Sequence, residues 1–511
     1  MKPFDIEILD TTLRDGEQTH NVSFTNAEKL HIARILLERV HVDRIEIASA
    51  RVSKGEEESV KNIISWAKKT NKDYLERIEI LGFVDGTHSV DWIKKTGAKI
   101  LNLLTKGSLK HLKGQLRKTP EEHFRDIEKT ILYAHKNKIS VNIYLEDFSN
   151  GYLSSVNYVY DIISFLSNLP VKRIMLPDTL GIMYPKTVYD SIYDISNRFK
   201  NIHFDFHPHN DYGLGTVNVL ESIKAGAKGV HVTVNCLGER AGNASLAEVT
   251  ANIHDNLKLK TRIHEKSLTL ISGVVETLSG KRVSPNAPVI GEDVFTQTAG
   301  IHADGDKKGG LYENPLIPQR FGRKRSYALG KLAGKASIEH NLKNMGIDLS
   351  EENKKRVLEK IVELGDQKKT VTAEDLPFIV ADVLKIPRHI KLHIEKAVIT
   401  SGKGMYAVCS LKLKYKNEEY NITGNGDGGY DAFMNAISGW AEKQKIIMPK
   451  LIDYEVRIPP GGKTSALVEC KISWQPDIKK NEHTITTIGI DSDQVLAAVN
   501  ATERMLNIIL S

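Results

Sequence analysis

Two histidines at alternating positions, His207 and His209 in HFDFHPHND, are the residues whose types and spacing most clearly suggest chemistry. Alternate residues of a strand point to the same face, so the two imidazoles can hold one metal ion. Asp15, in DTTLRDGEQ (10–18), can supply a third, anionic ligand, and Asn243, in LGERAGN (237–243), can supply an amide oxygen. This set of nitrogen and oxygen ligands, with no thiolate, suits a divalent metal that keeps positions open for a substrate.

A His-x-His pair by itself is more often a packing or surface feature than a metal site. Whether this pair binds a metal is therefore judged from the other residues predicted to lie near it. Polar residues recur where predicted strands end, and they are Arg14, Asp15, Glu146, Asp178, Thr179, His207, His209 and Asn235. Active sites of parallel barrels are built at the carboxyl ends of their strands. We therefore expect these side chains to share one rim.

The elements that must position them are strands and helices in alternation over the first 235 residues. The predicted strands are 5–10, 44–49, 77–84, 100–105, 139–146, 173–179, 203–209 and 229–235. Strands separated by helical crossovers pair in parallel, and a count of eight favours an α/β fold, the closed (β/α)₈ TIM barrel. The alternative is an open doubly wound sheet, which is disfavoured because no glycine-rich dinucleotide fingerprint follows the first strand.

Composition excludes several classes of protein. A chain of 511 residues is too long for one core, and we expect roughly two to four domains. The net charge of +7 is spread over the sequence as a solvated surface, with some attraction for an anionic substrate, and no aromatic-interleaved basic patch predicts nucleic-acid binding. Three scattered cysteines, no signal peptide and no apolar run of membrane length predict a cytoplasmic protein that contacts no membrane.

The pattern changes beyond residue 270. The glycine-rich stretch 298–315 reads as a mobile lid loop, and two helical segments follow, the first with Ser350 as its N-cap. From about residue 390 two loosely similar segments each read as strand, turn, strand and helix. We predict a barrel with its lid over 1–325, a helical linker over 326–389, and an α+β regulatory domain of two ββα units over 390–511.

The motifs closely resemble those of the metal-dependent acyl-CoA Claisen condensing enzymes, which include isopropylmalate, homocitrate and citramalate synthases. DTTLRDGEQ, HPHNDYGLGTVN, NCLGERAGNASL and GIHADG match in order and spacing, and the C-terminal third resembles the allosteric domain of amino-acid-inhibited members. The resemblance implies an acyltransferase that uses acetyl-CoA as co-substrate, a divalent metal ion (Mn²⁺, Mg²⁺ or Zn²⁺) and a homodimer. Related carboxyltransferases and hydroxymethylglutaryl-CoA lyases are disfavoured, because the chain lacks a biotin-linked partner domain and the lyases' cysteine-bearing glycine loop.

The resemblance gives Asp15, His207, His209 and Asn243 as the metal ligands. The expected condensation requires further groups beside the metal ligands. Arg14 is a fixed cation that can stabilise an alkoxide, and Glu146 is our candidate for the base that takes a proton from acetyl-CoA; the alternative for Glu146 is a structural salt bridge.

Three further residues take their roles from the resemblance. Thr179 resembles the residue that binds the carboxylate of the 2-oxo acid. His302 and Tyr312 resemble residues that complete the site and assist proton transfer, in some members from the partner subunit.

The 2-oxo acid is predicted from the end of the fourth strand. Isopropylmalate synthases carry an H-x-x-x-A-T-S stretch there, whereas this chain has NLLTKGS (102–108). Leu81, Leu104 and Tyr144 resemble the bulky pocket of bacterial citramalate synthases, which leaves room for the methyl group of pyruvate; the alternative is that they are only barrel core. We expect citramalate synthesis in isoleucine biosynthesis, with isopropylmalate synthesis for leucine as the alternative.

A branched-chain amino acid is the expected effector of the C-terminal domain. The residues that match an isoleucine pocket are Tyr430, Asp431, Leu451, Tyr454, Ile458 and Val468. The alternative for them is ordinary core packing. A non-enzyme alternative for the whole chain is an amino-acid sensor on a degenerate barrel, which would not keep an occupied metal site.

Overall fold

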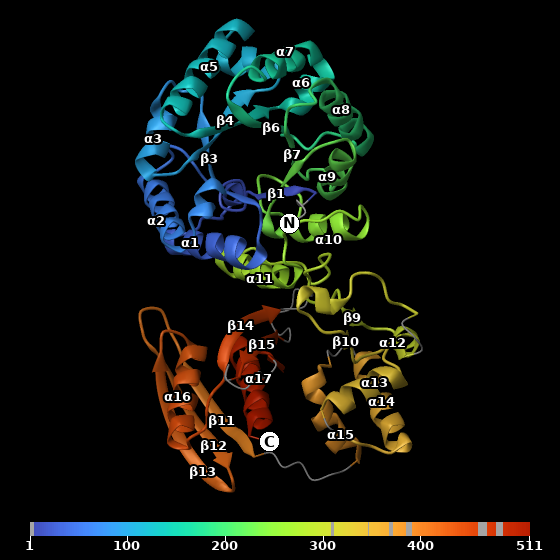
Figure 1. Cartoon of the computed structure of the whole chain (residues 1–511). Helices are drawn as coiled ribbons and strands as arrows, with labels where there is room; N and C mark the ends of the chain where they lie inside the picture. Colours follow the sequence, from blue (N-terminus) through green and yellow to red (C-terminus); the bar gives the residue numbers. More distant parts are fainter. Residues whose placement is uncertain are drawn as a thin grey trace. The chain divides into compact units, whose positions relative to one another are not determined.

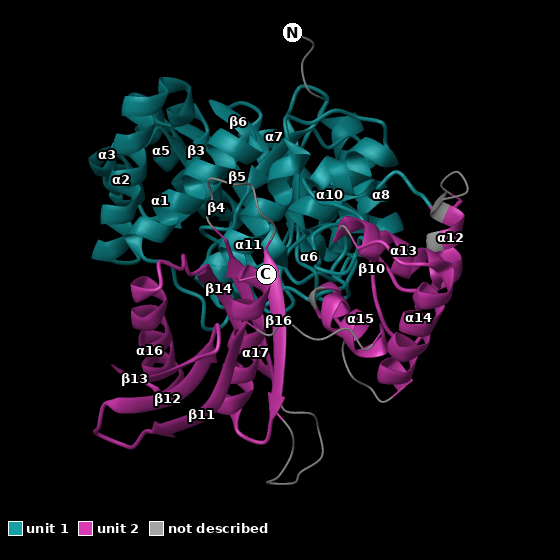
Figure 2. Cartoon of the chain, turned by 90° about the horizontal axis from the view of Figure 1, so that it is seen from below, with its two compact units in different colours: residues 1–295, 313–325 teal, residues 296–312, 326–511 magenta. Residues whose placement is uncertain are grey.

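The computed structural model describes residues 5–307, 311–345, 347–366, 371–384, 391–457, 468–476 and 484–510. The chain divides into two compact units, one formed by Met1–Phe295 with Glu313–Arg325 and the other by Thr296–Tyr312 with Ser326–Ser511 (Figure 2). The domain boundaries predicted from the sequence stay predictions. Among the described residues no helix is both long enough and apolar enough to cross a lipid bilayer.

Eight parallel strands close into a barrel in the first unit, and the helices that follow them in the chain form its outer ring (Figure 1). The strands are β1 (Glu7–Asp10), β2 (Arg44–Ser49), β3 (Ile78–Phe83), β4 (Ile100–Lys106), β5 (Ser140–Glu146), β6 (Val171–Asp178), β7 (Phe204–Pro208) and β8 (Gly229–Val232). β8 pairs with β1 in parallel, which closes the barrel and excludes the open sheet. The predicted fold class is confirmed.

The surrounding helices carry the apolar stripes that the sequence predicts. They are α1 (Asn26–Ile35), α2 (Lys54–Thr70), α3 (His88–Thr96), α4 (Leu109–His111), α5 (Pro120–Lys136), α6 (Phe148–Ser154), α7 (Val156–Leu166), α8 (Pro185–Arg198), α9 (Gly215–Lys224), α10 (Leu246–Asp255) and α11 (Leu268–Ser279). In α5, Thr119 and Glu122 form a capping box that fixes where the helix begins. Ile127, Ile131 and Ala134 of the same helix are buried against the barrel.

Inside the barrel, one layer of side chains is polar and hydrogen-bonded. The amide of Asn102 donates to Glu46 at 2.7 Å and to Glu79 at 2.9 Å. The guanidinium of Arg44 donates to Glu79 at 2.9 Å and to Asp205 at 2.5 Å. All five side chains are buried, so these partners satisfy groups that would otherwise be costly to remove from water.

The lid segment is not the loop that its glycine content predicted. Within the predicted segment 298–315, the helix α12 (Gly300–Lys307) lies next to a two-stranded sheet of β9 (Thr296–Gln297) and β10 (Ser326–Tyr327), whereas 311–315 form neither helix nor strand. The prediction was wrong because Gly300 serves packing rather than mobility. A β-carbon added there would lie 2.7 Å from the Cα of Gly334, so only glycine allows the two backbones to approach.

Three further helices of the second unit pack around a small apolar core. They are α13 (Lys335–Asn344), α14 (Glu351–Asp366) and α15 (Leu376–Leu384). Both helical segments predicted for this region are present. The hydroxyl of Ser350 accepts a hydrogen bond from the backbone N–H of Asn353 at 3.3 Å, so Ser350 caps α14 as predicted.

The last 120 residues contain two similar antiparallel sheets, each followed by a helix. The elements are β11 (Leu392–Thr400), β12 (Ala407–Tyr415), β13 (Glu418–Gly426) and α16 (Gly429–Lys443), then β14 (Lys450–Arg457), β15 (Val468–Gln475), β16 (Ile485–Asp491) and α17 (Gln494–Ile509). Both predicted strand–turn–strand–helix units are present, and each has one additional strand before it.

The glycines of these sheets allow close helix packing. A β-carbon at Gly424 would lie 2.5 Å from the carbonyl oxygen of Ala432 in α16, and one at Gly489 would lie 1.9 Å from that of Ala497 in α17. A glycine that lets a strand approach its helix closely therefore occurs in both halves of the C-terminal module, which these strands and helices form. Gly424 and Gly426 both belong to strand β13 and lie against the backbone of α16.

Candidate active site

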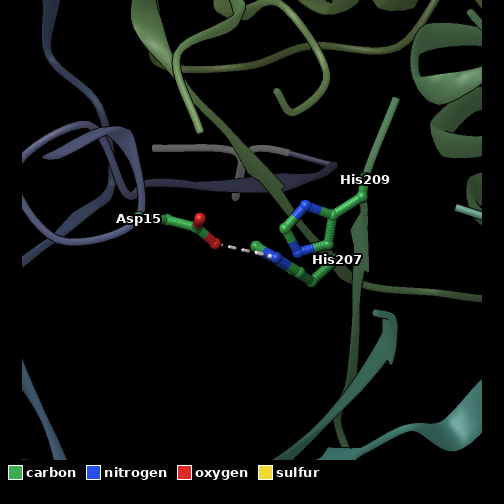
Figure 3. Close-up of side chains that lie close together, drawn as sticks. All are labelled: Asp15, His207 and His209. Atoms are coloured by element: carbon green, nitrogen blue, oxygen red, sulfur yellow. Dashed lines mark ion pairs between the residues drawn. The ribbon is translucent and has the colours of Figure 1, made fainter. Parts of the chain in front are cut away.

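Asp15, His207 and His209 form a buried cluster at the carboxyl end of the barrel strands. One potential ligand atom from each lies within 4.8 Å of the other two. The two imidazoles come from the end of β7, with ring centroids 5.1 Å apart, and the Nε2 atom of His207 is 3.1 Å from a carboxylate oxygen of Asp15 (Figure 3). The segment after β1 and the end of β7 therefore bring together the three groups that the sequence pattern singled out.

Asn243 reaches the cluster through an isolated β-bridge to His209. Its amide nitrogen donates to the carbonyl of Leu237 at 3.1 Å, which directs the amide oxygen away from the loop backbone. The loop can take this path because Gly242 has a φ of 83°. A β-carbon there would lie 1.7 Å from the carbonyl oxygen of Cys236, so the position requires glycine.

The residues fit a divalent metal ion, on the evidence of their unpaired polar atoms. Oδ1 of Asp15, Nδ1 of His209 and Oδ1 of Asn243 are buried and have no hydrogen-bond partner among the described residues. Buried polar atoms are normally paired, and one carboxylate, one imidazole and one amide oxygen left open at the same place are suitable metal ligands.

The protonation states agree with this fit. Burial raises the pKa of Asp15, but the neighbouring Arg14 guanidinium and His207 outweigh burial and hold this pKa well below its usual range. Burial lowers the pKa of His209 to about 4, so that its ring is neutral at physiological pH. An ionised carboxylate and a neutral imidazole are the forms that bind metals.

Arg14 lies between two carboxylates. Its Nε donates to Glu46 at 2.5 Å and its Nη1 is 3.2 Å from Asp15. Arg14 is also 5.8 Å from the ring of Tyr144, whose hydroxyl is 3.5 Å from Nη2. The guanidinium is therefore held in one orientation beside the metal ligands, as a cation placed to face a developing negative charge.

The three residues of the predicted substrate pocket lie in one small apolar cluster. Leu81 of β3, Leu104 of β4 and Tyr144 of β5 pack with Leu9 and Met175, separately from the main barrel core. Leu81 and Tyr144 are buried. Because Tyr144 also packs edge-on against His207, with ring centroids 6.0 Å apart, this cluster adjoins the metal ligands.

Glu146, at the end of β5, is ion-paired with Lys106, at the end of β4. Lys106 is almost fully buried, whereas the side chain of Glu146 is 23% exposed. The salt bridge that the sequence analysis held as an alternative is thus present. It does not exclude a role as base, because the side chain of Glu146 stays partly exposed at the end of β5.

Thr179 follows β6, and its hydroxyl accepts a hydrogen bond from the N–H of Asp147 at 2.9 Å. Its carbonyl accepts from Arg240 at 2.9 Å. The hydroxyl hydrogen of Thr179 remains free to donate to a bound carboxylate. Asp178 instead supports the loop, because its carboxylate accepts from the N–H groups of Ile182 and Met183.

His302 and Tyr312 lie together in the second unit, with ring centroids 4.3 Å apart. His302 belongs to α12, and the side chain of Tyr312 is 45% exposed. The metal ligands lie in the first unit. The sequence resemblance thus paired two residues that the fold places in contact, and their role in the reaction stays a prediction.

The predicted effector residues are distributed over both halves of the C-terminal module. The ring of Tyr430 lies 5.0 Å from that of Tyr454, and its hydroxyl is 2.8 Å from that of Thr502. Asp431 is exposed and Val468 is buried. Leu451 is 36% exposed, and Ile458 lies outside the described residues.

Two residues that border the site were missed from the sequence. Glu46 anchors Arg14, and His231 of β8 lies 3.1 Å from the Tyr144 hydroxyl and 3.3 Å from His207. Glu46 occurs in an ordinary alternating strand, and His231 occurs in GVHV without a companion histidine. The one available signal was that each is a charged or titratable residue on a strand of an apolar barrel.

Comparison with known proteins assigns the chain to families. Residues 5–275 match the HMGL-like family, 289–369 the homocitrate synthase post-HMGL domain-like family, and 370–510 the LeuA allosteric (dimerisation) domain. An (R)-citramalate synthase of Methanocaldococcus jannaschii is 33% identical over 513 residues, which cover 99% of this chain and 100% of the relative. A 2-isopropylmalate synthase of the same organism is also 33% identical, over 100% of this chain and 95% of the relative.

The family matches, the closed barrel and the full-length similarity to two synthases agree with one another. They exclude the interpretation of the chain as a sensor on a degenerate barrel. The chain belongs to the isopropylmalate and citramalate synthase family of HMGL-like barrel proteins, and it is an acyl-CoA-dependent condensing enzyme.

Proposed function

We propose that the enzyme condenses acetyl-CoA with pyruvate and water to give (R)-citramalate and CoA. The observation that carries this proposal is the cluster of Leu81, Leu104 and Tyr144 beside Arg14 and the metal ligands. Three bulky side chains at this point leave room for the methyl group of pyruvate and crowd the isopropyl group of 2-oxoisovalerate. The steric difference is worth a few kcal/mol at most.

Asp15, His207, His209 and Asn243 would hold a divalent ion, Mn²⁺, Mg²⁺ or Zn²⁺. The chemistry that such an ion supplies is Lewis-acid polarisation of the 2-oxo carbonyl. Arg14 donates hydrogen bonds to the oxygen that becomes an alkoxide during attack. The anions Glu46 and Asp15 keep its guanidinium in place before the reaction starts, so that no reorganisation is needed.

Glu146 removes a proton from the methyl group of acetyl-CoA. The ion pair with Lys106 restrains the position of the Glu146 side chain that acts as this base. The hydroxyl of Thr179 donates to the substrate carboxylate.

His302 and Tyr312 complete the site and assist proton transfer to the alkoxide, and water then hydrolyses the thioester. Because the chain carries a LeuA dimerisation domain, we propose that the enzyme is a homodimer and that these two residues act in the site of the same or of the partner subunit.

The C-terminal module binds isoleucine as a feedback inhibitor, which places the enzyme in isoleucine biosynthesis. Support comes from Tyr430 and Tyr454, which bring together α16 of one half and β14 of the other. A ligand bound between two halves can favour one arrangement of them over another, which feedback inhibition requires.

Isopropylmalate synthesis is the second candidate, and the equal identity to the two Methanocaldococcus synthases supports it. The deciding experiment measures release of free CoA from acetyl-CoA in the presence of a divalent metal, with pyruvate and 2-oxoisovalerate in parallel. We expect kcat/KM to favour pyruvate by about 10- to 100-fold. A preference for 2-oxoisovalerate would establish the second candidate instead.

The Asp15→Ala variant tests the metal site in the same assay. We expect turnover to be abolished while the circular dichroism spectrum stays that of the folded protein, because the variant removes an anionic ligand but no core packing. Near-normal turnover of this variant would show that the proposed metal site is wrong.

A further inference from the structure

His231 lies in the interior of the barrel, at the point where the metal ligands and the substrate pocket meet. Its ring is 1% exposed. The Nδ1 atom is 3.3 Å from Nδ1 of His207 and 3.1 Å from the hydroxyl oxygen of Tyr144. On the opposite side of the ring, Nε2 is 3.2 Å from Oδ2 of Asp205.

These contacts specify where the ring protons lie. Asp205 is paired with the guanidinium of Arg44, so it is an ionised acceptor. His231 therefore donates from Nε2 to Asp205, and a neutral imidazole that donates from Nε2 accepts at Nδ1. The Nδ1–H group of His207 and the hydroxyl of Tyr144 can both donate to that one acceptor.

The consequence for His207 is that its Nδ1–H group can donate to His231, which leaves Nε2 as the ring nitrogen available to a metal ion. Nε2 is the atom that faces Asp15 at 3.1 Å, on the side of the metal ligands. Metal-binding histidines commonly donate their other ring N–H to a fixed acceptor, which sets both the tautomer and the orientation of the ring. In this chain the acceptor is a second histidine, itself oriented by a buried carboxylate.

We propose that His231, held by Asp205, is a positioning residue that fixes the tautomer of His207 for metal binding and orients the hydroxyl of Tyr144 in the substrate pocket. The inference deepens the proposed function and rests on it for the identity of the metal ligands. It links the metal site and the pocket through a single side chain that contacts neither metal nor substrate.

The backbone is adapted to this arrangement. Gly229 of β8 is paired with Asp205 of β7, and a β-carbon at Gly229 would lie 2.2 Å from the carboxylate of Asp205. Any larger residue would displace the carboxylate that orients His231. The glycine at the start of β8 therefore provides the space that the Asp205–His231 pair occupies.

The test compares two substitutions by the Mn²⁺ affinity of the full-length protein, measured by titration calorimetry. His231→Leu removes the acceptor, whereas His231→Asn places an amide oxygen near the position of Nδ1. We expect His231→Leu to weaken Mn²⁺ binding by about 10- to 100-fold and His231→Asn to restore most of the affinity. If both variants bind Mn²⁺ as tightly as the wild type, or if both are equally weak, the proposal is overturned.

Two control variants separate the proposed route from general damage. Tyr144→Phe removes the other donor to His231, and we expect it to leave the Mn²⁺ affinity unchanged. His254 also pairs with a carboxylate, Glu265 at 2.9 Å, but lies on α10. His254→Leu should therefore not alter Mn²⁺ binding, and a loss as large as that of His231→Leu would contradict the proposal.

A second measurement uses the wild-type protein, so its result does not depend on whether a variant folds. Nitrogen-15 NMR of histidine-labelled wild-type protein loaded with Zn²⁺ shows which ring nitrogen of His207 binds the metal. We expect Nε2 to bind and Nδ1 to carry the proton, and a metal-bound Nδ1 would overturn the proposal. These readouts do not involve pyruvate, so a wrong substrate assignment would leave them unaffected and would appear in CoA release alone.

Discussion

At the scale of single residues, the site depends on buried charges that hold one another in place. Arg14 is kept beside the predicted metal ligands by Glu46, which is itself fully buried and accepts from Asn102. A buried carboxylate is tolerated here because two donors satisfy it. The sequence pointed to Arg14 through its motif, whereas Glu46 is recognisable only from its contact with Arg14.

The substitution Glu46→Gln should lower kcat for CoA release while leaving Mn²⁺ affinity close to that of the wild type. The amide keeps a weak hydrogen bond but loses the charge that fixes the guanidinium, and a misplaced oxyanion donor costs about 10²-fold. Steady-state kinetics and calorimetry on the same preparation check this result. An unchanged kcat would mean that Arg14 is oriented without Glu46.

The substitution Leu104→Ala should enlarge the substrate pocket and raise kcat/KM for 2-oxoisovalerate relative to pyruvate by about 10-fold or more. The matched control is Leu103→Ala, the next residue of the same strand, whose side chain packs in the main barrel core instead. We expect the control to lose about 2 to 5 kcal/mol of stability with no change in selectivity. Equal selectivity in both variants would show that Leu104 is only core.

At the scale of elements, the loop after β8 delivers Asn243, and its backbone shape rests on glycine. Gly242→Ala would place a β-carbon against the carbonyl of Cys236, so the loop must shift and take Asn243 with it. We expect Mn²⁺ affinity to fall. Gly280→Ala is the control, because Gly280 also has a positive φ, 66°, but has open space around it. It should cost about 1 kcal/mol of stability and leave metal binding intact.

A second prediction at this scale concerns Arg320, which follows α11 and pairs with Asp255 at the end of α10 and with Glu265 in the turn before α11. Burial raises the pKa of Glu265, but His254 and Arg320 outweigh it and lower this pKa to about 2. The folded-state value lies below the unfolded value of about 4.3, so the carboxylate stabilises the fold at neutral pH. This contribution is lost as the pH falls from about 4 towards 2.

The measurement compares urea unfolding of the wild type and of Glu265→Gln at pH 7 and at pH 3. We expect the variant to be less stable by about 1 to 2 kcal/mol at pH 7, a figure reduced for partial solvent exposure. The difference should shrink at pH 3. A difference that does not depend on pH would mean that the charge of Glu265 contributes nothing.

At the scale of the whole molecule, one chain carries an HMGL-like barrel and a C-terminal module that matches the LeuA allosteric (dimerisation) domain. The module has its own apolar core, and the partly buried pair Tyr430–Tyr454 packs against it, with the Tyr430 hydroxyl 2.8 Å from that of Thr502. Nothing in the barrel site requires these residues, so inhibition and catalysis should be separable by substitution.

The substitution Tyr430→Phe should raise the isoleucine concentration needed for half-inhibition, while CoA release without isoleucine persists. The reason is that the variant removes only the hydroxyl that bonds to Thr502, and not the ring contact with Tyr454. Inhibition curves for the two proteins, with light scattering to confirm the same oligomeric state, check the prediction. Unaltered inhibition would place the effector elsewhere.

Local patterns predicted much of the fold. The eight barrel strands, the helical cap at Ser350 and the His207–His209 pair follow from spacings of two to four residues, which strand and helix geometry set directly. The same reasoning gave a wrong prediction for the lid at Gly300–Lys307. Gly300 lets its backbone approach that of Gly334 closely, and the number of glycines does not distinguish such packing from mobility.

By itself, the sequence determined which residues lie on the barrel rim and which chemical groups they offer. Only the tertiary structure decided their partners: Glu46 for Arg14, Lys106 for Glu146, and His231 with Asp205 for His207. The physical reason is that a side chain's direction follows from its own strand, whereas its neighbour follows from the register in which separate strands close the barrel. Packing over the whole barrel fixes that register, so no short stretch of the sequence predicts it.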